Sequence, residues 1–385
     1  MNVTISLSGR FHAFNQAQQL HRHHSLERLI TTYPKFEVKK YGVPPSRVKS
    51  LLRYELASRG WNKYLASRTS DWFDFHSWYC DAFDHAAAKH IPPSTDVYIG
   101  WASKSEQGLR RAKELGALAI LDRGSSHAVY NKRILAEEYE KYGVKKWLPP
   151  EEIIQKELRE YDLADYILIP SSFVKRSFME QGVPESKLIT IPYGVDLKYF
   201  RPVEKEDSKF RVLYVGGMHL RKGVHYLLQA FHELNLPDAE LWLIGSKSPE
   251  IEPFLEKYSR NVRYFGHLPQ PELHKYYSQC SVFCICSIEE GMAMVQVQAM
   301  ACGLPLICTT NTGGEDLIDD GECGFVVSIR DIDKLKNRLL WCFLNQSECK
   351  DMGDIARKRV SETYSWNDYG NRLSIEISDR RYLAK

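Results

Sequence analysis

The sequence predicts an α/β protein built from two doubly wound domains. The chain has 385 residues, more than the ~250–300 residues at which a single hydrophobic core usually stops growing. Short runs rich in β-branched residues alternate with amphipathic helical stretches in both halves of the chain. Such alternation is typical of parallel sheets joined by right-handed crossovers, whose ligands bind at the carboxyl ends of the strands.

The individual elements can be placed by residue range. The strands expected in the first half are residues 3–9, 96–102, 117–124, 165–171 and 188–194, with helices over 15–32, 104–115 and 149–163. The strands expected in the second half are residues 210–217, 239–246, 261–268, 281–287, 304–310 and 324–328, followed by a helical tail after residue 331. The polar segment 200–209 marks a boundary. We therefore expect an N-terminal domain over 1–200, a C-terminal domain over 201–365, and a final helix over 366–385 that packs back on the N-terminal domain.

Composition excludes several classes of protein. A hydrophobic content of 43% with 26% charged residues is ordinary for a globular protein, and a net charge of +3 argues against a nucleic-acid binder. No apolar run approaches the ~20 residues of a membrane span, and the start lacks a signal-peptide pattern. These features predict a cytoplasmic protein. The spacing of Cys280, Cys284 and Cys286 matches no common zinc site, and alternation along residues 281–287 places the last two on one strand face.

The first loop whose residues could bind a ligand is VGGMHLRKG, residues 215–223. Gly216 and Gly217 directly follow a strand, so the backbone there can approach an anion closely. Arg221 and Lys222 sit beside the start of the next helix, where two cations and the helix dipole can offset the charge of a diphosphate. The alternative is an ordinary strand–helix turn with solvated basic residues.

The second loop, SIEEGMAMVQVQAMACGLP, spans residues 287–305. Glu290 lies at the carboxyl end of a strand, and a helix is expected from about Met294 to Cys302. The backbone amides of residues 292–295 would face a phosphate. Because phosphate repels a carboxylate, we expect Glu290 to accept hydrogen bonds from sugar hydroxyls; the alternative is a helix cap. A third loop, residues 309–314, again places hydroxyls and glycines after a strand.

These loops, in this order and spacing, resemble the retaining GT-B glycosyltransferases of family 4. The matching motifs are Lys222-Gly223, Glu290-Gly291 and AMACGLP at residues 299–305, and residues 170–202 resemble the interdomain segment of that family. The resemblance covers about residues 165–365. The family pattern has an arginine at the position of Gly217 and a second glutamate at the position of Gln298.

The resemblance implies a GT-B fold of two Rossmann-like domains facing across a cleft. It implies a nucleotide-sugar substrate, such as a UDP- or GDP-sugar, with no cofactor. No DxD-like triplet lies on a suitable loop, since Asp331-Ile332-Asp333 begins the tail helix, so we expect no metal. Glu290 would hold donor-sugar hydroxyls, Arg221 and Lys222 would stabilise the departing diphosphate, and Gln298 would take the place of the ribose-binding glutamate, more weakly. The predicted donor-binding residues are Gly9, Gly216, Gly217, Arg221, Gly291, Met292, Ala293, Met294, Val295 and Gln298.

The first half supplies further candidates. Gly9 follows the first strand in SLSGRFH, and Arg10 and His12 can face the cleft. LDRGSSHAVY repeats this geometry, with Asp122 ending a strand. The resemblance implies that a histidine from this region contacts the donor sugar near the reacting carbon, and we assign His127; the alternative is an ordinary histidine at a helix start. The predicted catalytic set is His127, Lys222 and Glu290.

Residues 35–68 combine basic and aromatic side chains on an expected helix. The basic residues are Lys35, Lys39, Lys40, Arg47, Lys49, Arg53, Arg59, Lys63 and Arg68. Such a segment suits an anionic membrane surface or a phosphate-bearing, lipid-linked acceptor, and the alternative is a solvated basic face. The near-neutral chain argues against RNA.

The sequence thus predicts a retaining, metal-independent hexosyltransferase of cell-surface polysaccharide or glycolipid synthesis, in the cytoplasm or at the inner face of the membrane. In the expected mechanism, the leaving diphosphate helps to deprotonate an acceptor hydroxyl of a glycan or lipid-linked molecule through an oxocarbenium-like transition state. One alternative is another GT-B reaction, such as nucleotide-sugar epimerisation. A second alternative is a non-catalytic pseudoenzyme that binds a nucleotide-sugar or glycan, which Gln298 and Gly217 favour.

Overall fold

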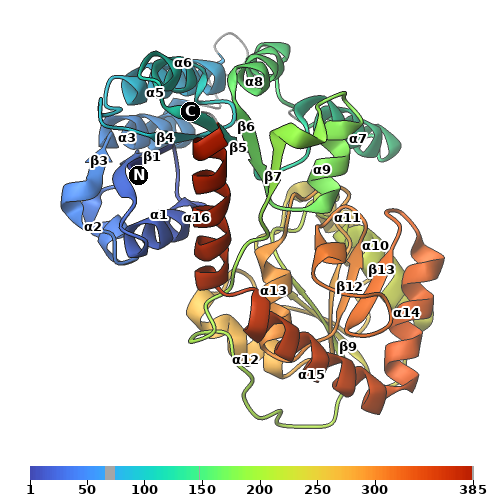
Figure 1. Cartoon of the computed structure of the whole chain (residues 1–385). Coiled ribbons are helices and arrows are strands. Elements are labelled where there is room, and N and C mark those ends of the chain that lie inside the picture. The colour runs from blue at the N-terminus through green and yellow to red at the C-terminus, as the bar shows by residue number, and fades with distance from the viewer. Residues whose placement is uncertain (66–73, 147, 384–385) are drawn as a thin grey trace.

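The computed structural model of the chain describes residues 1–65, 74–146 and 148–383. It contains two parallel sheets whose successive strands are joined mainly through helices (Figure 1). The inner strands β1, β5, β8 and β9 are buried along their whole length. Continuous apolar runs of this kind are what a parallel sheet covered on both faces requires. The predicted α/β architecture of two doubly wound domains is confirmed.

The N-terminal sheet has seven strands in the order β3-β2-β1-β4-β5-β6-β7. Its strands are β1 (Val3–Leu7), β2 (Leu26–Thr31), β3 (Val48–Ser50), β4 (Val97–Trp101), β5 (Leu118–Asp122), β6 (Tyr166–Ile169) and β7 (Leu188–Thr190). Its helices are α1 (Ala13–Arg22), α2 (Lys35–Lys39), α3 (Leu52–Gly60), α5 (Phe75–Ala88), α6 (Glu106–Glu114), α7 (Ala128–Lys141), α8 (Glu151–Leu163) and α9 (Ser172–Met179).

Two expectations for the first half were wrong. The helix expected over 15–32 ends at Arg22, because His24 takes the left-handed conformation (φ 54°) and turns the chain into strand β2. Strand β2 then pairs with β1 and β3, which buries its apolar residues in the sheet. The single helix expected within 35–68 is instead α2, β3 and α3, ending in a π-helical turn (Trp61–Leu65). Arg68 lies outside the described residues.

The C-terminal sheet has six strands in the order β10-β9-β8-β11-β12-β13. Its strands are β8 (Arg211–Val215), β9 (Glu240–Ile244), β10 (Val262–Tyr264), β11 (Val282–Ile285), β12 (Leu306–Thr309) and β13 (Gly324–Val327). The helices are α10 (Val224–Leu234), α11 (Glu252–Lys257), α12 (Leu273–Ser278), α13 (Met294–Ala301), α14 (Ile332–Leu344), α15 (Gln346–Thr363) and α16 (Trp366–Leu383). Every strand expected in this half is present, as is the helical tail.

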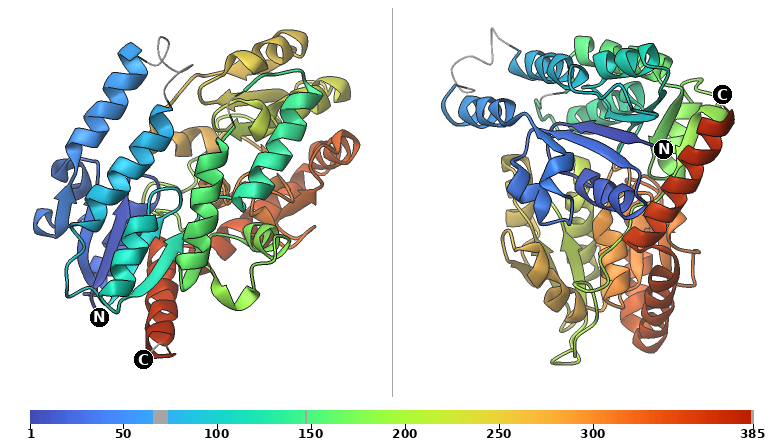
Figure 2. Two further views of the ribbon diagram at one scale, coloured as in Figure 1. Left: turned by 90° about the horizontal axis from the view of Figure 1, so that it is seen from above. Right: turned by 60° about the vertical axis from the view of Figure 1, so that its left-hand side comes forward.

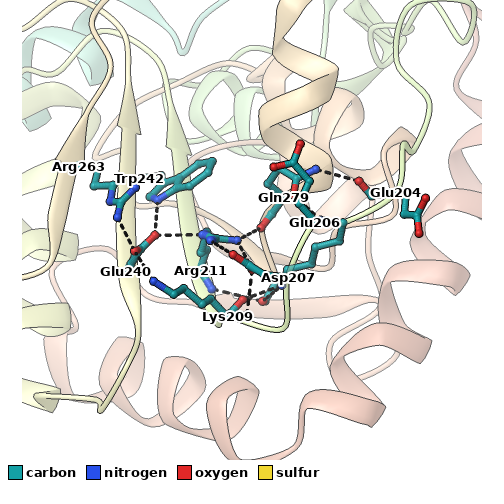
Figure 3. A network of polar contacts seen from close by, with 11 residues as sticks. Glu204, Glu206, Asp207, Lys209, Arg211, Glu240, Trp242, Arg263 and Gln279 are labelled. Atoms are coloured by element: carbon teal, nitrogen blue, oxygen red, sulfur yellow. Dashed lines mark hydrogen bonds and ion pairs between the residues drawn. The ribbon is translucent and has the colours of Figure 1, made fainter.

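A network of charged side chains lies at the amino ends of β8 and β9 (Figure 3). The Arg211 guanidinium forms two parallel hydrogen bonds of 2.7 and 2.6 Å to the Asp207 carboxylate and a third of 3.0 Å to Glu240. Glu240 also accepts from the indole of Trp242 (2.9 Å) and pairs with Arg263 (2.9 Å). The hydrogen bonds from Arg211 lower the pKa of Asp207 to about 2. The network fastens the interdomain segment to the sheet.

Two helices connect the domains. Helix α16 leaves the C-terminal domain and lies along α1 of the N-terminal domain (Figure 1; Figure 2, right). Gly370 is required there, because a Cβ would lie 2.6 Å from that of Gln19. Helix α7 buries Ile134, Leu135 and Tyr139 in the core of the C-terminal domain. The domains therefore share packed elements on two sides.

All nine cysteines are buried free thiols. The sulfurs of Cys284 and Cys286 lie 3.6 Å apart, which confirms that they share one face. Among the residues described, no group of three or more His, Cys, Asp or Glu is placed to hold a metal ion. No helix in the same parts of the chain has the length and hydropathy needed to cross a bilayer.

Candidate active site

The loop after β11 in the C-terminal domain packs against the loop after β5 in the N-terminal domain. The buried carboxylate of Glu289 accepts hydrogen bonds from both the backbone N–H (3.0 Å) and the hydroxyl (2.8 Å) of Ser126. A Cβ at Gly291 would lie 1.9 Å from the carbonyl oxygen of Gly124, so only glycine permits this approach. The Ser171 hydroxyl donates to the Gly291 carbonyl (2.6 Å). The carboxyl ends of the two sheets are thus joined at the predicted Glu-Gly motif.

A 3₁₀ turn, η4 (Leu220–Lys222), presents the two predicted cations to this loop. Gly223 ends the turn with φ 63°, and a Cβ there would lie 1.8 Å from the carbonyl oxygen of Cys286. The Arg221 Nε lies 3.0 Å from the carbonyl oxygen and 3.1 Å from the carboxylate of Glu289. The same guanidinium lies 3.3 Å from Glu290, and Lys222 forms a close ion pair with Glu290. The structure therefore brings Arg221, Lys222 and Glu290 together.

Opposing effects act on the pKa values of the charged groups in this cluster. Burial and the neighbouring Arg221 lower the pKa of Lys222 to about 7, against the attraction of Glu289. Burial disfavours the ionised form of Glu289, but Arg221, the hydrogen bonds from Ser126 and the charge of Arg123 together hold its pKa below the usual range. Glu289 is therefore ionised at neutral pH, whereas Lys222 is poised between its charged and neutral forms.

Helix α13 begins where predicted. The backbone amides near its start differ in whether they already have a hydrogen-bond acceptor within the protein. The N–H of Ala293 donates to the Thr312 carbonyl (3.3 Å), so this predicted phosphate-binding amide already has a partner. The Met292 sulfur accepts from the Tyr193 backbone N–H (3.2 Å). Met294 and Val295 open the helix, where amides have no intrahelical acceptor. Gln296 is tied to Thr312 by hydrogen bonds from each side chain, which fixes the third loop to the second.

The remaining donor-binding candidates make contacts within their own domains. Gln298 is buried, and its side-chain oxygen accepts a hydrogen bond from the Tyr277 hydroxyl (3.3 Å). Gly217 accepts from the Tyr214 hydroxyl through its carbonyl (2.8 Å). The carbonyl oxygen of Gly216 is so close to β9 that a Cβ at position 245 would lie 1.9 Å from it. The N–H of Gly9 (φ 104°) donates a hydrogen bond to the hydroxyl of Thr32, the residue that follows β2 (3.2 Å).

The structure gives His127 the role that the sequence left as the alternative. Its Nδ1 accepts a hydrogen bond from the N–H of Val129 (3.3 Å), which caps α7. Its ring packs on Tyr161 and Phe178, with centroids 4.9 and 5.0 Å away. Burial and the charge of Arg123 lower its pKa to about 4. His127 therefore caps the helix through Nδ1, and its contact with a donor sugar stays a prediction.

Sequence reasoning missed Glu289 and Arg123. The only signal was a second acid beside Glu290, and nothing in the pattern showed that Glu289 would be the buried one. Arg123 pairs with Glu157 (2.8 Å) and donates to the Ser126 carbonyl (3.1 Å), which braces the loop that Glu289 contacts. Next to these residues, a cavity of about 390 Å³ opens between the domains. Its polar lining includes His76, Ser103, Arg123, Tyr139, His219 and Arg221.

The basic and aromatic segment lies apart from this cluster. Leu56, Tyr64 and Leu65 project from it with exposed side chains. Three of its cations pair with nearby acids, in the pairs Lys40–Glu37, Arg47–Glu27 and Arg59–Glu55. The segment therefore has exposed apolar and basic side chains, and part of its charge is neutralised.

Comparison with known proteins gives a family match for part of the chain. Residues 196–359 match the family model described as "Glycosyl transferases group 1", and the match contains the η4 turn and the Glu-Gly loop. The matched residues make up less than half of the chain. Among its relatives, the MMP alpha-(1->4)-mannosyltransferase of Mycolicibacterium hassiacum is 27% identical over 230 residues, 58% of this chain and 55% of the relative. The GDP-mannose-dependent alpha-(1-6)-phosphatidylinositol monomannoside mannosyltransferase of Mycolicibacterium smegmatis is 26% identical over 246 residues, 57% of this chain and 63% of the relative.

These alignments span little more than half the length of the relatives, whereas the structural likeness covers whole chains. The sucrose-phosphate synthase of Thermosynechococcus elongatus matches with a TM-score of 0.73 at 18% identity, over 100% of both chains. Anabaena HepE in complex with UDP-glucose matches with a TM-score of 0.70 at 14% identity, over 98% of this chain and 100% of HepE. This likeness confirms the predicted GT-B fold.

Proposed function

We propose that this protein transfers a sugar from a nucleotide-sugar to a hydroxyl group of a glycan or lipid-linked acceptor. The observation that carries the proposal is the convergence of Arg221, Lys222 and Glu290 at the carboxyl end of the C-terminal sheet. The family match and the names of the relatives support the same class of reaction.

In the proposed reaction, the donor diphosphate takes the place of Glu290 beside the two cations. Glu290 is then free to accept hydrogen bonds from hydroxyls of the donor sugar. Arg221 and Lys222 stabilise the negative charge that develops on the leaving diphosphate, and Glu289 holds Arg221 in place. Donors fixed before the reaction in a partly buried site stabilise a transition state without the cost of reorganisation.

We further propose that the transfer retains the anomeric configuration and needs no metal ion. The basis for retention is the resemblance to family 4, and the basis for metal independence is the pair of cations beside the expected diphosphate. Product anomers determined by NMR test the first statement, and turnover in excess EDTA tests the second. An inverted product, or activity that is lost in EDTA and returns with Mg²⁺, would contradict them.

We infer the donor and acceptor classes from the names of the relatives and from a solved structure of similar fold. Relatives are named as mannosyltransferases, one of them GDP-mannose-dependent, and HepE was solved with UDP-glucose. We propose a UDP- or GDP-hexose donor and a role in cell-surface polysaccharide or glycolipid synthesis. The exposed apolar and basic groups of residues 35–65 would then meet anionic lipid at the inner face of the membrane, where a lipid-linked acceptor resides.

The first experiment is a thermal-shift screen of UDP- and GDP-sugars, followed by transfer assays with the donor that stabilises the protein. A ligand at 100 times its Kd adds about 2.7 kcal/mol to the free energy of unfolding, which raises the Tm measurably. We expect one nucleotide series to shift the Tm and its sugar to be transferred. No shift with any nucleotide-sugar would contradict the proposal.

A nucleotide-sugar-binding pseudoenzyme is the second candidate. It is favoured by Gln298, which stands where the family has a glutamate and already accepts a hydrogen bond from Tyr277. Calorimetry separates the two candidates. Donor binding without transfer or hydrolysis across a panel of glycan and lipid acceptors supports the pseudoenzyme, and transfer to any acceptor excludes it.

A further inference from the structure

The cavity of about 390 Å³ that opens between the domains adjoins the donor cluster. Arg221 lines the cavity and lies 3.3 Å from Glu290. Ser125 also lines it, and a Cβ at Gly291 would lie 2.9 Å from the Cα of Ser125. A molecule in this cavity would therefore lie against the loop that is proposed to hold the donor sugar.

Two helices of the N-terminal domain contribute walls to the cavity. The lining residues include Ala128, Asn131, Leu135 and Tyr139 on α7, and Ile153 and Glu157 on α8. Because the α7 residues follow one another at intervals of three or four, they share one face of that helix. Leu135 and Ile153 are apolar, whereas Asn131 and Glu157 are polar. The cavity therefore suits a ligand that has both an apolar and a polar part.

The charged side chains that line the cavity are mainly cations. Arg123, Lys146 and Arg221 contribute three positive charges. Glu157 is the one acid among the described residues that line the cavity. A surface with this excess of positive charge favours an anionic ligand over a neutral one.

Neighbouring groups do not reverse this excess. Glu250 pairs with Lys146 but is not among the described lining residues. Glu289 lies 3.1 Å from the Arg221 guanidinium and is not among them either. Burial lowers the pKa of the two lining histidines, to about 3 in His219, so neither adds charge at neutral pH. The surface that a ligand would touch therefore keeps its positive charge.

Arg123 is the lining cation whose position is fixed best. It donates two hydrogen bonds to the Ser126 carbonyl (3.1 and 3.0 Å) and one to Glu157 (2.8 Å). A guanidinium has five N–H donors, so two have no partner in the part of the chain that the structure describes. Because the guanidinium is already held, it loses little side-chain entropy when it binds an anion. Arginine can also give two hydrogen bonds to one phosphate group.

We propose that this cavity binds the acceptor, and that the acceptor carries a phosphate group that Arg123 holds. The inference rests on the proposed glycosyltransferase function and names the chemical class of its acceptor. Apolar groups of the acceptor would lie against Leu135 and Ile153, and the hydroxyl that receives the sugar would point toward Gly291. A lipid-linked glycosyl phosphate and a free sugar phosphate share this chemistry, and they differ in the apolar chain.

A phosphate-bearing acceptor has to lie near the donor diphosphate, and like charges repel. Arg221 lines the cavity and also reaches Glu290, beside which the diphosphate is proposed to bind. Its guanidinium can therefore attract both anions, while Arg123 holds the acceptor phosphate and Lys222 the diphosphate. Cations shared between the two sites offset the repulsion between the two substrates.

The first test measures acceptor binding to the protein saturated with UDP or GDP, whichever stabilises it, so that the diphosphate site is already occupied. Octyl glucoside, octyl glucosyl phosphate and glucose 1-phosphate are titrated by calorimetry, together with their mannose counterparts. We expect the octyl glycosyl phosphate to bind at least roughly tenfold more tightly than the octyl glycoside, because its phosphate adds charged hydrogen bonds to Arg123. Tighter binding of the octyl glycosyl phosphate than of the sugar 1-phosphate would assign a lipid-linked acceptor, and equal binding a free sugar phosphate.

Asn131→Asp tests where the phosphate lies, because it adds a negative charge to the lining at nearly unchanged size. We expect the phosphate probes to bind roughly tenfold more weakly to this variant, and the octyl glycoside to change less than about twofold. Asn131→Ala removes the amide without adding charge and should have the smaller effect on the phosphate probes. Lys132→Gln is the matched control, since Lys132 lies on the same helix, pairs with Glu151 (3.1 Å) and is not among the lining residues. It should leave every Kd within about twofold.

Two results would overturn the inference. One is equal binding of the octyl glycoside and its phosphate by the wild-type protein in both sugar series, which decides the matter even if Asn131→Asp does not fold. The other is an Asn131→Asp protein of unchanged Tm that keeps its affinity for the phosphate probes, or loses affinity for phosphate and neutral probes alike. Failure of the proposed function is a separate result, because it shows as absence of nucleotide-sugar binding.

Discussion

Two clusters of charged residues lie at opposite ends of the same C-terminal sheet, and they differ in what their charges experience. At the amino ends of β8 and β9, Arg211 lowers the pKa of Asp207 to about 2, and the pKa of Arg211 is itself raised by Asp207 and Glu240 despite burial (Figure 3). At the carboxyl ends, the pKa of Lys222 is lowered to about 7. The surroundings of the first cluster stabilise the charged forms of its side chains. The surroundings of the second cluster destabilise the charged form of Lys222.

The difference separates stability from function. A network whose members favour their charged forms needs no ligand. A buried lysine that is partly neutralised gains most when an anion arrives, which is the pattern expected of a binding site. Ion pairs alone therefore do not mark the site in this protein, because both clusters have them.

The strongest test of the difference between the two clusters is to remove one cation from each and compare the effects on catalysis. Lys222→Ala should lower kcat/KM roughly 100- to 1000-fold, the usual effect of deleting one group that stabilises transition-state charge. Lys209→Ala, which removes an exposed partner of Glu240 in the amino-end network, should leave kcat/KM within about twofold. Steady-state kinetics with the selected donor decides. Unchanged turnover and donor binding in Lys222→Ala would contradict the phosphate assignment.

The reverse experiment acts on stability. Arg211→Met should lower the free energy of unfolding by roughly 1–3 kcal/mol, because Glu240 loses a charged hydrogen-bond donor at a buried position. Donor affinity should stay within about twofold, since the site lies at the other end of the sheet. Urea unfolding and calorimetry measure the two effects. A large loss of donor affinity at unchanged stability would reverse the roles that we give to the two clusters.

Glu289 tests whether contact between the domains supports the site. Glu289→Gln keeps the size of the side chain and removes the charge that faces Arg221, so we expect kcat to fall roughly tenfold through misplacement of the guanidinium. Ser126→Ala removes the hydroxyl donor but keeps the backbone N–H, so its effect should be smaller. Equal kcat values for Glu289→Gln and the wild type would show that Arg221 is positioned without this carboxylate.

The smallest expected effect is the uptake of protons by the protein when the donor binds. A bound diphosphate favours the charged form of Lys222, so its pKa should rise from about 7 on binding. Binding at pH 7 should then take up roughly half a proton, which calorimetry in buffers of different ionisation enthalpy detects. Affinity should be greatest below pH 7 and should fall as pH rises through 7 towards the bound pKa. Lys222→Met should abolish the uptake, and wild-type-like uptake in this variant would assign the proton elsewhere.

Much of the architecture could be predicted because it depends on residues that are close together in the sequence. Alternating apolar runs and helical stretches located the strands of the C-terminal domain, and the helix expected from about Met294 to Cys302 is α13. Local periodicity failed at β2, where a polar-looking stretch pairs between two strands. That outcome depends on partners far along the chain, which a short window does not contain.

The sequence by itself determined the doubly wound fold, the order of the loops, and the presence of Lys222, Glu290 and Gly291 at the ends of strands. Only the tertiary structure decided which of two adjacent glutamates is buried and joins the domains, and which of two helix-start histidines caps its helix. The reason is physical. Strand and helix patterns arise from neighbours in sequence, whereas burial, pKa and free hydrogen-bonding capacity depend on residues such as Ser126 and Asp122, which lie more than 100 positions away from Glu289 and His12.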